Sequence, residues 1–338
     1  MIISVNLGNH SYDVVVRRGL LNEVGSHLDL NRRVLIVTDS GVPQEYARTV
    51  AEACLSPRIV TVPEGEQSKS IANWERLCTA MLEHGMTRTD CVVAVGGGVV
   101  GDLAGFAAAS FMRGIDFYNI PTTVLSQVDS SIGGKVAVDL AGIKNCVGAF
   151  HQPKKVLVDP NVLRTLPPRQ ISNGLAEAVK MALTFDKDLF ERIEQAADPF
   201  ADIEHIIARS LQLKAAVVEE DETETGLRKV LNFGHTVGHG IETEEGLSGL
   251  YHGECVALGM LTMCAPTVKN RLLRVLETLQ LPTSLNYDPE RIWQAMCHDK
   301  KKAGNQFTVV YVPSVGSYEL RTVSESDLRQ TLKEALTQ

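Results

Sequence analysis

Hydrophobic positions in the first half of the chain form short β-branched runs separated by amphipathic segments. Such runs occupy residues 34–38, 58–62, 91–95, 117–120 and 156–158, and two earlier runs at 2–7 and 12–16 flank Gly8 and Asn9. Two runs joined by such a pair predict a β-hairpin at the start of the chain. Short strands that are apolar on both faces, with helical segments between them, indicate a parallel sheet covered on both sides. We therefore predict a doubly wound α/β domain at residues 1–159.

From about residue 160 the hydrophobic positions recur with a period of 3.6 residues. The periodic segments lie at residues 174–185, 200–218, 230–245, 255–279 and 289–297. This period is typical of amphipathic helices, so we predict a mainly α-helical second domain at residues 160–338. A late stretch at 307–320 predicts one or two strands, interrupted near Pro313 and Gly316.

Composition limits the classes of partner. The length of 338 residues suits two domains of ~150 residues each. Lys and Arg number 33 against 41 Asp and Glu, and a net charge of −8 argues against binding nucleic acid or an anionic membrane by bulk charge. We see no signal peptide and no apolar run near the ~20 residues of a membrane helix. The seven scattered cysteines, without a Cys-x-x-Cys pair, indicate reduced thiols in a cytoplasmic protein.

A glycine-rich loop follows the run at 91–95. The sequence GGGVVGD at residues 96–102 fits Gly-x-Gly-x-x-Gly between a predicted strand and an alanine-rich helix. Without side chains, such a loop lets a diphosphate approach the backbone N–H groups at the helix N-terminus. The glycine-rich loop follows an internal strand and not the first one. Asp39, the acidic residue that could bind a ribose hydroxyl, lies at the end of an earlier predicted strand. For Asp39 and for the segment PEGEQSK at 63–69, an ordinary solvated loop is the alternative interpretation.

Three histidines suggest a metal site. His235 and His239 are four residues apart and would share one face of a helix, while His252 follows a glycine-containing turn. A catalytic zinc site with three protein ligands would also need a carboxylate. Glu177 is the best donor, because it lies in an otherwise apolar helix and a buried carboxylate is costly unless it is paired or bound to a metal. An ion pair between Glu177 and Lys180, with ordinary core histidines, explains the same spacing without a metal.

Several basic residues stand among small or apolar neighbours. Cations placed in this way suggest convergence on phosphate or carboxylate groups, although each one alone is more often a surface residue. Asp129 could be a buried acid or their counter-charge. The basic residues are Arg113, Lys135, Lys144, Lys214 and Arg228.

Taken in order along the chain, these motifs resemble those of 3-dehydroquinate synthases from about residue 60 to 305. The matching segments are PEGEQSK at 63–69, GGGVVGD at 96–102, PTTVLSQVDSSIGGK at 121–135, KN at 144–145, GLAEAVK at 174–180 and NFGHTVGH at 232–239. The resemblance implies a Rossmann-like parallel-sheet domain that binds NAD, followed by an α-helical domain that binds metal and substrate.

The resemblance also implies a set of functional residues. It implies zinc, or cobalt in its place, held by Glu177, His235 and His252. It implies NAD bound by Asp39, Glu66, Lys69, Gly97, Gly98, Val99, Asp102, Thr122, Thr123, Lys144, Val162, Leu163, Arg164 and Thr165. Catalytic residues would be Asp129, Lys135, Lys180, Lys214, Arg228, Asn232 and His239, with further substrate contacts from Arg113, Asn145 and Lys300.

The implied reaction converts 3-deoxy-D-arabino-heptulosonate 7-phosphate into 3-dehydroquinate and phosphate in the shikimate pathway. It combines transient oxidation by NAD, phosphate elimination, reduction, ring opening and an intramolecular aldol reaction. A homodimer is expected, in which Arg113 could act across subunits. The alternatives are a sugar-phosphate cyclase of the 2-deoxy-scyllo-inosose or valiolone type, a metal-dependent polyol dehydrogenase, and a non-enzymatic module that binds zinc and nucleotide.

Overall fold

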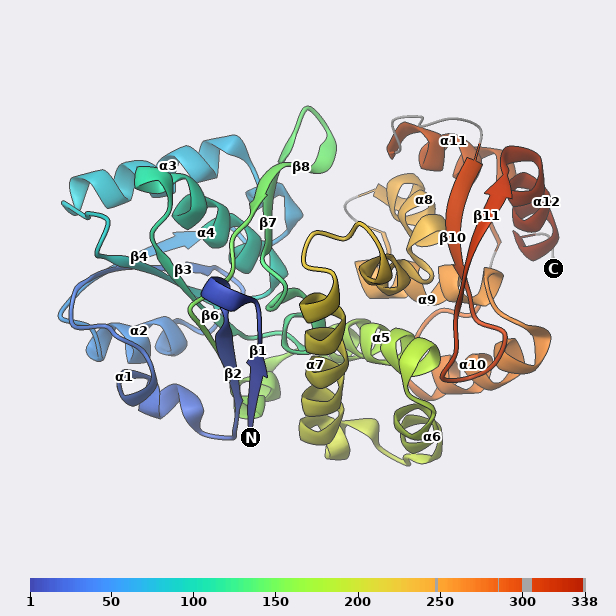
Figure 1. The fold of residues 1–338 in the computed structure, drawn as a ribbon, viewed down its shortest axis with the longest axis horizontal. Helices are drawn as coiled ribbons and strands as arrows, with labels where there is room; N and C mark the ends of the chain where they lie inside the picture. The colour runs from blue at the N-terminus through green and yellow to red at the C-terminus, as the bar shows by residue number, and fades with distance from the viewer. Residues whose placement is uncertain (247–248, 285, 300–305, 337–338) are drawn as a thin grey trace. The chain divides into compact units, whose positions relative to one another are not determined.

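The computed structural model describes residues 1–246, 249–284, 286–299 and 306–336. The chain forms two compact units (Figure 1). Unit 1 comprises Met1–Pro167 and Lys214–Thr223, and unit 2 comprises Pro168–Leu213 and Glu224–Gln338. The functional division at residue 160 stays a prediction.

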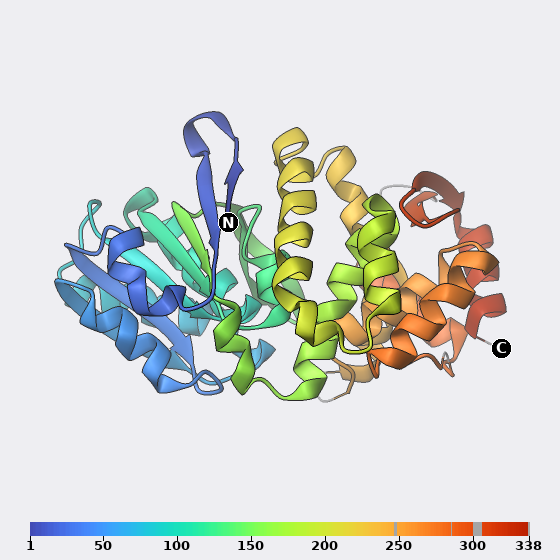
Figure 2. The same cartoon turned by 90° about the horizontal axis from the view of Figure 1, so that it is seen from below.

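A seven-stranded sheet forms the centre of unit 1. Its order is β1-β2-β9-β6-β5-β3-β4, in which β1 and β2 are antiparallel and every other neighbouring pair is parallel. The predicted parallel sheet and the N-terminal hairpin are thus confirmed, and Figure 2 shows the hairpin extending away from the other strands. The strands are β1 (Ile2–Val5), β2 (Tyr12–Val16), β3 (Arg33–Asp39), β4 (Ser56–Val62), β5 (Cys91–Gly96), β6 (Asp116–Pro121) and β9 (Lys155–Val158).

Helices cover both faces of this sheet because its central strands are apolar on both sides. Leu35 and Val92 pack on one face in a cluster with α3 (Ile71–Glu83) and α4 (Gly98–Ser110). Ile36 and Val93, one residue later in each strand, pack on the other face in a cluster with α1 (Val24–His27) and α2 (Gln44–Glu52). All six residues of β5 are buried. This strand therefore lies in the middle of the core and fixes the loop that follows it.

The connections change direction between β3 and β5. The chain runs from β3 through α2 to β4 on one side, and from β5 through α4 to β6 on the other, while β3 and β5 pair with each other. In open parallel sheets, ligands bind outside the carboxyl ends of the strands at such a switch point. The topology of unit 1 therefore marks one edge of the sheet as a binding edge.

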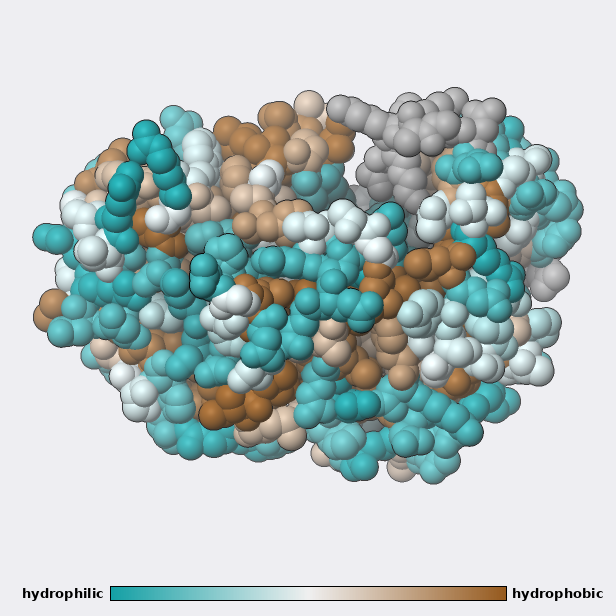
Figure 3. Space-filling view, in the orientation of Figure 1, coloured by the Kyte–Doolittle hydropathy of each residue, from teal (hydrophilic) through white to brown (hydrophobic). Residues whose placement is uncertain are grey.

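A second hairpin, β7 (Lys135–Leu140) and β8 (Ile143–Phe150), was not predicted. Its two-residue turn has positive φ at both positions, 52° at Ala141 and 78° at Gly142, as a type I′ turn requires. Most of β8 is exposed, so it lacks the alternation by which a half-buried strand is recognised. Figure 3 shows apolar surface over this hairpin, where Leu140, Ile143 and Phe150 are exposed.

Unit 2 is mainly helical, as predicted. A small antiparallel sheet of β10 (Gln306–Tyr311) and β11 (Glu319–Ser324) confirms the late strands. Helix α7 begins in unit 2, and its residues from Lys214 on belong to unit 1. The helices are α5 (Pro168–Phe185), α6 (Lys187–Gln195), α7 (Ile203–Glu220), α8 (His235–Glu245), α9 (His252–Thr262), α10 (Pro266–Thr278), α11 (Pro289–Asp299) and α12 (Glu325–Leu336).

Two of the predicted helices are each divided, which corrects the sequence analysis. The segment 230–245 is interrupted at Gly234, which has a φ of 78° and precedes the first residue of α8. The segment 255–279 is interrupted before Pro266, which begins α10 because proline lacks the N–H that a helix interior needs. The first interruption makes His235 a helix-start residue.

Helices α8 and α9 approach each other closely. A Cβ added at Gly259 would lie 1.9 Å from the backbone O of Gly234, and one at Gly238 would lie 2.9 Å from the backbone O of Cys255. Side chains larger than hydrogen would separate these backbones. The glycines therefore allow the two helices that carry His235 and His252 to pack side by side.

All seven cysteines are free thiols. In the part of the chain that the structure describes, none of the helices has both the length and the apolar character needed to cross a membrane.

Candidate active site

The residues predicted to bind NAD gather at the carboxyl edge of the parallel sheet in unit 1. Because the strands run in the same direction, segments that follow them emerge along one edge. Asp39 ends β3, Glu66 and Lys69 follow β4, Gly97, Gly98 and Val99 follow β5, Thr122 and Thr123 follow β6, and Val162, Leu163, Arg164 and Thr165 lie in the 3-10 helix Pro160–Thr165 after β9.

The glycine loop lies against the end of β6. A Cβ added at Gly97 would lie 2.9 Å from Thr123 Cγ2, and one at Gly98 would lie 3.1 Å from Ser130 Oγ. The loop leads directly into α4, so the backbone N–H groups of the first turn lie at the binding edge. This arrangement suits a diphosphate.

Asp39 shapes the turn after β3. Its Oδ1 accepts hydrogen bonds from the backbone N–H groups of Gly41 at 2.8 Å and Val42 at 3.1 Å. Burial raises the pKa of Asp39 above its usual range, although these two hydrogen bonds oppose the shift. The carboxylate is therefore held in a fixed orientation at the switch point.

Lys69 connects three segments of unit 1. Its Nζ lies 3.0 Å from Asp102 Oδ2 and 3.2 Å from Glu66 Oε1, and it donates to Asn145 Oδ1 in β8. Lys69 is only 4% exposed. Burial alone would lower the pKa of Lys69, but the two carboxylates outweigh burial and raise it. The predicted cofactor residues Glu66, Lys69 and Asp102 thus form one cluster in which two carboxyl groups contact a single ammonium group, and this cluster also contains the predicted substrate residue Asn145.

Asp129 and Lys214 form a second pair in unit 1. Lys214 Nζ donates to the backbone O of Asp129 at 2.7 Å and forms an ion pair with the Asp129 carboxylate. Asp129 lies in a five-residue π-helix, Ser126–Ser130, a widened turn that is frequent at functional sites. Three other predicted residues of unit 1 are exposed to solvent. Lys135 and Lys144 lie in the β7–β8 hairpin, and Arg113 has a φ of 69°.

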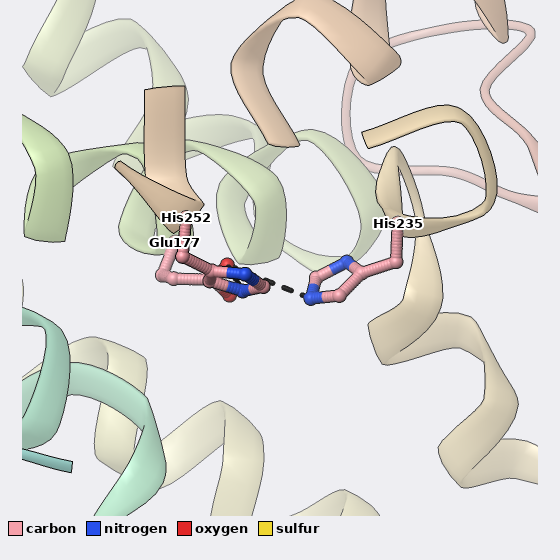
Figure 4. A group of neighbouring side chains, drawn as sticks. All are labelled: Glu177, His235 and His252. Carbon is pink, nitrogen blue, oxygen red and sulfur yellow. Dashed lines mark ion pairs between the residues drawn. The ribbon is translucent and has the colours of Figure 1, made fainter. Parts of the chain in front are cut away.

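In unit 2, Glu177, His235 and His252 converge from three helices (Figure 4). Glu177 lies in the middle of α5, while His235 and His252 are the first residues of α8 and α9. The Nε2 atoms of His235 and His252 lie 3.7 Å and 3.6 Å from Glu177 Oε1. The structure thus brings together the three residues predicted to hold the metal.

Each histidine is held through its other ring nitrogen. His235 Nδ1 lies 3.1 Å from the backbone O of Phe233, and His252 Nδ1 lies 3.3 Å from Glu242 Oε2. A neutral imidazole with its hydrogen on Nδ1 carries its lone pair on Nε2, and in both residues Nε2 faces Glu177. Histidine ligands of metals are usually oriented in this way by a backbone carbonyl or a carboxylate.

The two imidazoles differ in their affinity for a proton. Burial, with Lys180 and the other histidines nearby, holds the pKa of His235 well below its usual value. Burial would also lower the pKa of His252, but Glu177 and Glu242 outweigh it and raise that pKa to about 9. Without a metal, His235 is therefore neutral and His252 is an imidazolium at neutral pH.

This group of residues fits a divalent metal ion. Glu177 is 1% exposed, and neither carboxylate oxygen has a hydrogen-bond partner among the described residues, although Lys180 Nζ forms an ion pair with Oε2. Ligands about 2.0–2.2 Å from zinc in a tetrahedron lie roughly 3.3–3.5 Å apart. The observed separations of 3.6 Å and 3.7 Å are close to these values. The Glu177–Lys180 pair, which the sequence offered as an alternative to a metal, is present together with the converging histidines.

The other predicted residues of unit 2 lie in the same group of helices. His239 is one turn after His235, with ring centroids 5.3 Å apart. Arg228 is 2% exposed and Lys180 is 1% exposed, so both are buried cations. Asn232 Nδ2 donates to Glu224 Oε1 at 2.7 Å. Lys300 lies outside the described residues.

A network that the sequence analysis missed holds the start of α9. Glu254 receives a two-pronged contact from Arg169 of α5, 2.7 Å at each oxygen, and its Oε2 accepts the backbone N–H of Tyr251. The backbone N–H of Gly253 donates to Asn173 Oδ1 at 2.7 Å. Arg169, Asn173 and Glu177 follow one another at intervals of four residues. This stripe on α5 is the signal from which the network could have been found.

The chain is similar to known proteins along most of its length. Residues 59–173 match the family described as 3-dehydroquinate synthase N-terminal, and residues 174–302 match its C-terminal counterpart. The chain is 41% identical over 352 residues to a 3-dehydroquinate synthase of Enterococcus faecalis (strain ATCC 47077 / OG1RF), with 98% of each chain covered.

Two solved structures share the fold. One is 2-deoxy-scyllo-inosose synthase complexed with carbaglucose-6-phosphate, NAD+ and Co2+, at a TM-score of 0.88 and 26% identity over 99% of this chain and all of that one. The other is 2-epi-5-epi-valiolone synthase from Streptomyces hygroscopicus subsp. jinggangensis 5008 with NAD+ and Zn2+ bound. Its TM-score is 0.88 and its sequence identity is 28%, with 98% of this chain and 97% of that chain covered. The predicted fold class, a Rossmann-like sheet domain followed by a mainly helical domain, is confirmed.

Proposed function

Because the chain belongs to the 3-dehydroquinate synthase family, we propose that it converts 3-deoxy-D-arabino-heptulosonate 7-phosphate into 3-dehydroquinate and phosphate. The observation that carries this proposal is the convergence of Glu177, His235 and His252 in unit 2. The carboxyl edge of the sheet in unit 1 supports NAD as the second cofactor. Bound NAD+ with Zn2+ or Co2+ in the two structural relatives supports the same pair of cofactors here.

The metal would be held by one carboxylate and two neutral imidazoles. When bound, zinc polarises a substrate hydroxyl and stabilises the negative charge that develops on its oxygen. His252 must lose its proton before its Nε2 can act as a ligand, because the metal needs the neutral ring. Lys180 stays beside Glu177 as a buried cation, suited to hold an anionic group of the substrate.

The remaining predicted residues suit recognition of a phosphorylated acid. We assign the phosphate to Arg113, Lys135, Asn145 and His239, and the carboxylate or ring hydroxyls to Lys214, Arg228 and Asn232. Lys180, Lys214 and Arg228 are buried, and ion pairs with Glu177 and Asp129 hold Lys180 and Lys214 in place, so these cations suit contact with anionic groups of the substrate. Asp129 would orient Lys214 through the ion pair between them. The substrates of the related cyclases lack the carboxylate, so those enzymes would not need the set formed by Lys214, Arg228 and Asn232.

We further propose a cytoplasmic homodimer in which Arg113 reaches the partner's site. Support comes from the exposure of Arg113 and of the neighbouring Met112, which is 40% exposed, and from exposed Leu140, Ile143 and Phe150 in the β7–β8 hairpin. Apolar surface of this kind is frequently covered by a second copy in symmetric oligomers.

Turnover is the decisive test of the function. We expect the zinc-loaded protein with catalytic NAD to release one phosphate for each 3-dehydroquinate formed, without net accumulation of NADH. Glucose 6-phosphate and glycerol serve as alternative substrates. Faster turnover of glucose 6-phosphate would assign the chain to another sugar-phosphate cyclase activity, and steady production of NADH from glycerol would assign it to a polyol dehydrogenase.

The ligand set is tested by two histidine variants that lie one helical turn apart. His235→Ala should lose zinc during dialysis, because it removes one of three ligands. His239→Ala should keep zinc and instead raise the KM for the substrate, because we place His239 at the phosphate. Equal loss of zinc from both variants, measured by metal analysis, would contradict the assignment.

Mixing variants tests whether Arg113 acts across subunits. Arg113→Ala and Lys214→Ala should each be nearly inactive, while a mixture that has exchanged subunits should recover about a quarter of the wild-type rate, because one site in each mixed dimer is intact. A mixture that stays inactive after verified exchange would place Arg113 in its own subunit's site.

A further inference from the structure

His252 is the candidate ligand whose ring is contacted by carboxylates at both nitrogens. Its Nε2 lies 3.6 Å from Glu177 Oε1, and its Nδ1 lies 3.3 Å from Glu242 Oε2. Glu242 belongs to α8, seven residues after His235, so it lies on the same face of that helix. Its side chain is only 16% exposed.

We propose that Glu242 is a positioning residue for the metal centre, whose carboxylate accepts the Nδ1 hydrogen of His252 and so directs the Nε2 lone pair towards Glu177. Neutral imidazole exists in two tautomers, and only the one with hydrogen on Nδ1 can bind a metal through Nε2. A carboxylate behind the ring selects this tautomer and fixes its rotation. This inference rests on the metal centre of the proposed function.

Direct ligation by Glu242 is the competing interpretation. His239, Glu242 and His252 also bring potential ligand atoms within 4.8 Å of one another. Glu242, however, faces Nδ1 of His252, whereas Glu177 faces Nε2. Among the described residues neither oxygen of Glu177 has a hydrogen-bond partner, and Lys180 pairs with Oε2, so Oε1 stays open to an ion on the Nε2 side of the ring. The geometry therefore places Glu242 behind the ligand.

Zinc affinity of the metal-free full-length protein tests the role of Glu242 without substrate. Glu242→Ala should weaken zinc binding by about 10–100-fold in competition with a chromophoric chelator, as loss of such a partner typically does. Glu242→Gln should stay within a few-fold of wild type, since its amide oxygen can accept the same hydrogen. Glu244→Ala is the matched control, because Glu244 lies on the same helix and pairs with Arg291 at 3.0 Å.

The visible spectrum of the Co2+-loaded protein separates positioning from ligation. We expect Glu242→Gln to keep the wild-type spectrum, because its ligands are unchanged. Unchanged zinc affinity in Glu242→Ala would overturn the proposal. A Glu242→Gln variant that loses as much zinc affinity as Glu242→Ala and also shifts the cobalt spectrum would overturn it too, because Glu242 would then be a ligand. If Glu242→Ala fails to fold, Glu242→Met fills the space without an acceptor and replaces it. If the variants show the expected zinc affinities but the wild-type protein has no synthase activity, only the proposed function is refuted.

Discussion

The two histidines that face Glu177 hold protons differently, although they lie in the same cluster. Burial, with Lys180 and the two other histidines nearby, holds the pKa of His235 well below its usual value. His252 lies between two carboxylates, which raise its pKa to about 9. A metal that binds at neutral pH must therefore displace one proton, and that proton comes from His252.

This difference predicts the number of protons released when zinc binds. At pH 7.5 the metal-free protein should release about one proton for each zinc bound, because His252 is charged and His235 is not. The number should fall towards zero above pH 9, where His252 is already neutral. Calorimetry in buffers of different ionisation enthalpy measures the number of protons released for each zinc bound. A release of two protons, or of none, at pH 7.5 would contradict the pKa assignments.

The raised pKa of His252 also makes the stability of the metal-free protein depend on pH. A group whose pKa rises from 6.5 to about 9 on folding stabilises the fold fully below pH 6.5 and loses this contribution as the pH rises through 9. The difference in unfolding free energy between wild type and His252→Ala should therefore shrink between pH 6.5 and 9.5. Urea titrations at several pH values in the presence of a chelator test this, and a constant difference would argue against it.

At the scale of an element, the start of α9 is set by contacts with α5. Gly253 lies so close to that helix that an added Cβ would be 1.9 Å from the backbone O of Asn173. The backbone of α5 cannot yield as a flexible side chain would. Because His252 precedes Gly253, any displacement there moves a metal ligand.

Gly253→Ala should therefore impair both stability and metal binding. We expect a loss of about 3 kcal/mol in unfolding free energy, at the upper end for overpacking, together with at least tenfold weaker zinc binding. Gly25→Ala is the control, since its Cβ would lie 3.3 Å from Ala53 Cβ. Thermal unfolding and chelator competition provide the two measurements. Wild-type zinc affinity in Gly253→Ala would show that α9 can shift without moving His252.

Local pattern predicted the strands and helices in which apolar residues form short runs or recur with a regular period. The core strands follow from β-branched runs, and the glycine loop follows from its position after β5. The breaks before His235 and Pro266 could not be predicted from a hydrophobic period alone, because the period continues across them. Strand β8 of the second hairpin is mostly exposed and therefore carries no alternation. At the site, sequence spacing suggested His235 and Glu177, but the contact from Glu242 to His252 depends on how α8 and α9 pack.

At the scale of the whole molecule, each unit contains one of the two tryptophans. Trp74 lies on α3 in unit 1, where its Nε1 donates to Ser110 Oγ at 2.8 Å. Trp293 lies on α11 in unit 2, 5% exposed, with its ring centroid 5.4 Å from that of Phe307. The unfolding of each unit can therefore be followed separately in Trp74→Phe and Trp293→Phe.

We expect the two cofactors to protect different units. A ligand that binds only the folded state at about one hundred times its Kd stabilises that state by about 2.7 kcal/mol. Zinc should delay urea unfolding seen by Trp293 more than that seen by Trp74, and NAD should do the reverse. Fluorescence titrations of the two single-tryptophan variants measure this. Equal shifts for both probes with either ligand would show that the units unfold together.

The Glu177–Lys180 ion pair lies within one turn of α5, so the metal centre contains its own counter-charge. A buried carboxylate left without any cation would strongly favour unfolding. With Lys180 three residues away, the carboxylate keeps a compensating charge when the ion departs. Removal of the metal should therefore leave the chain folded and able to bind the metal again.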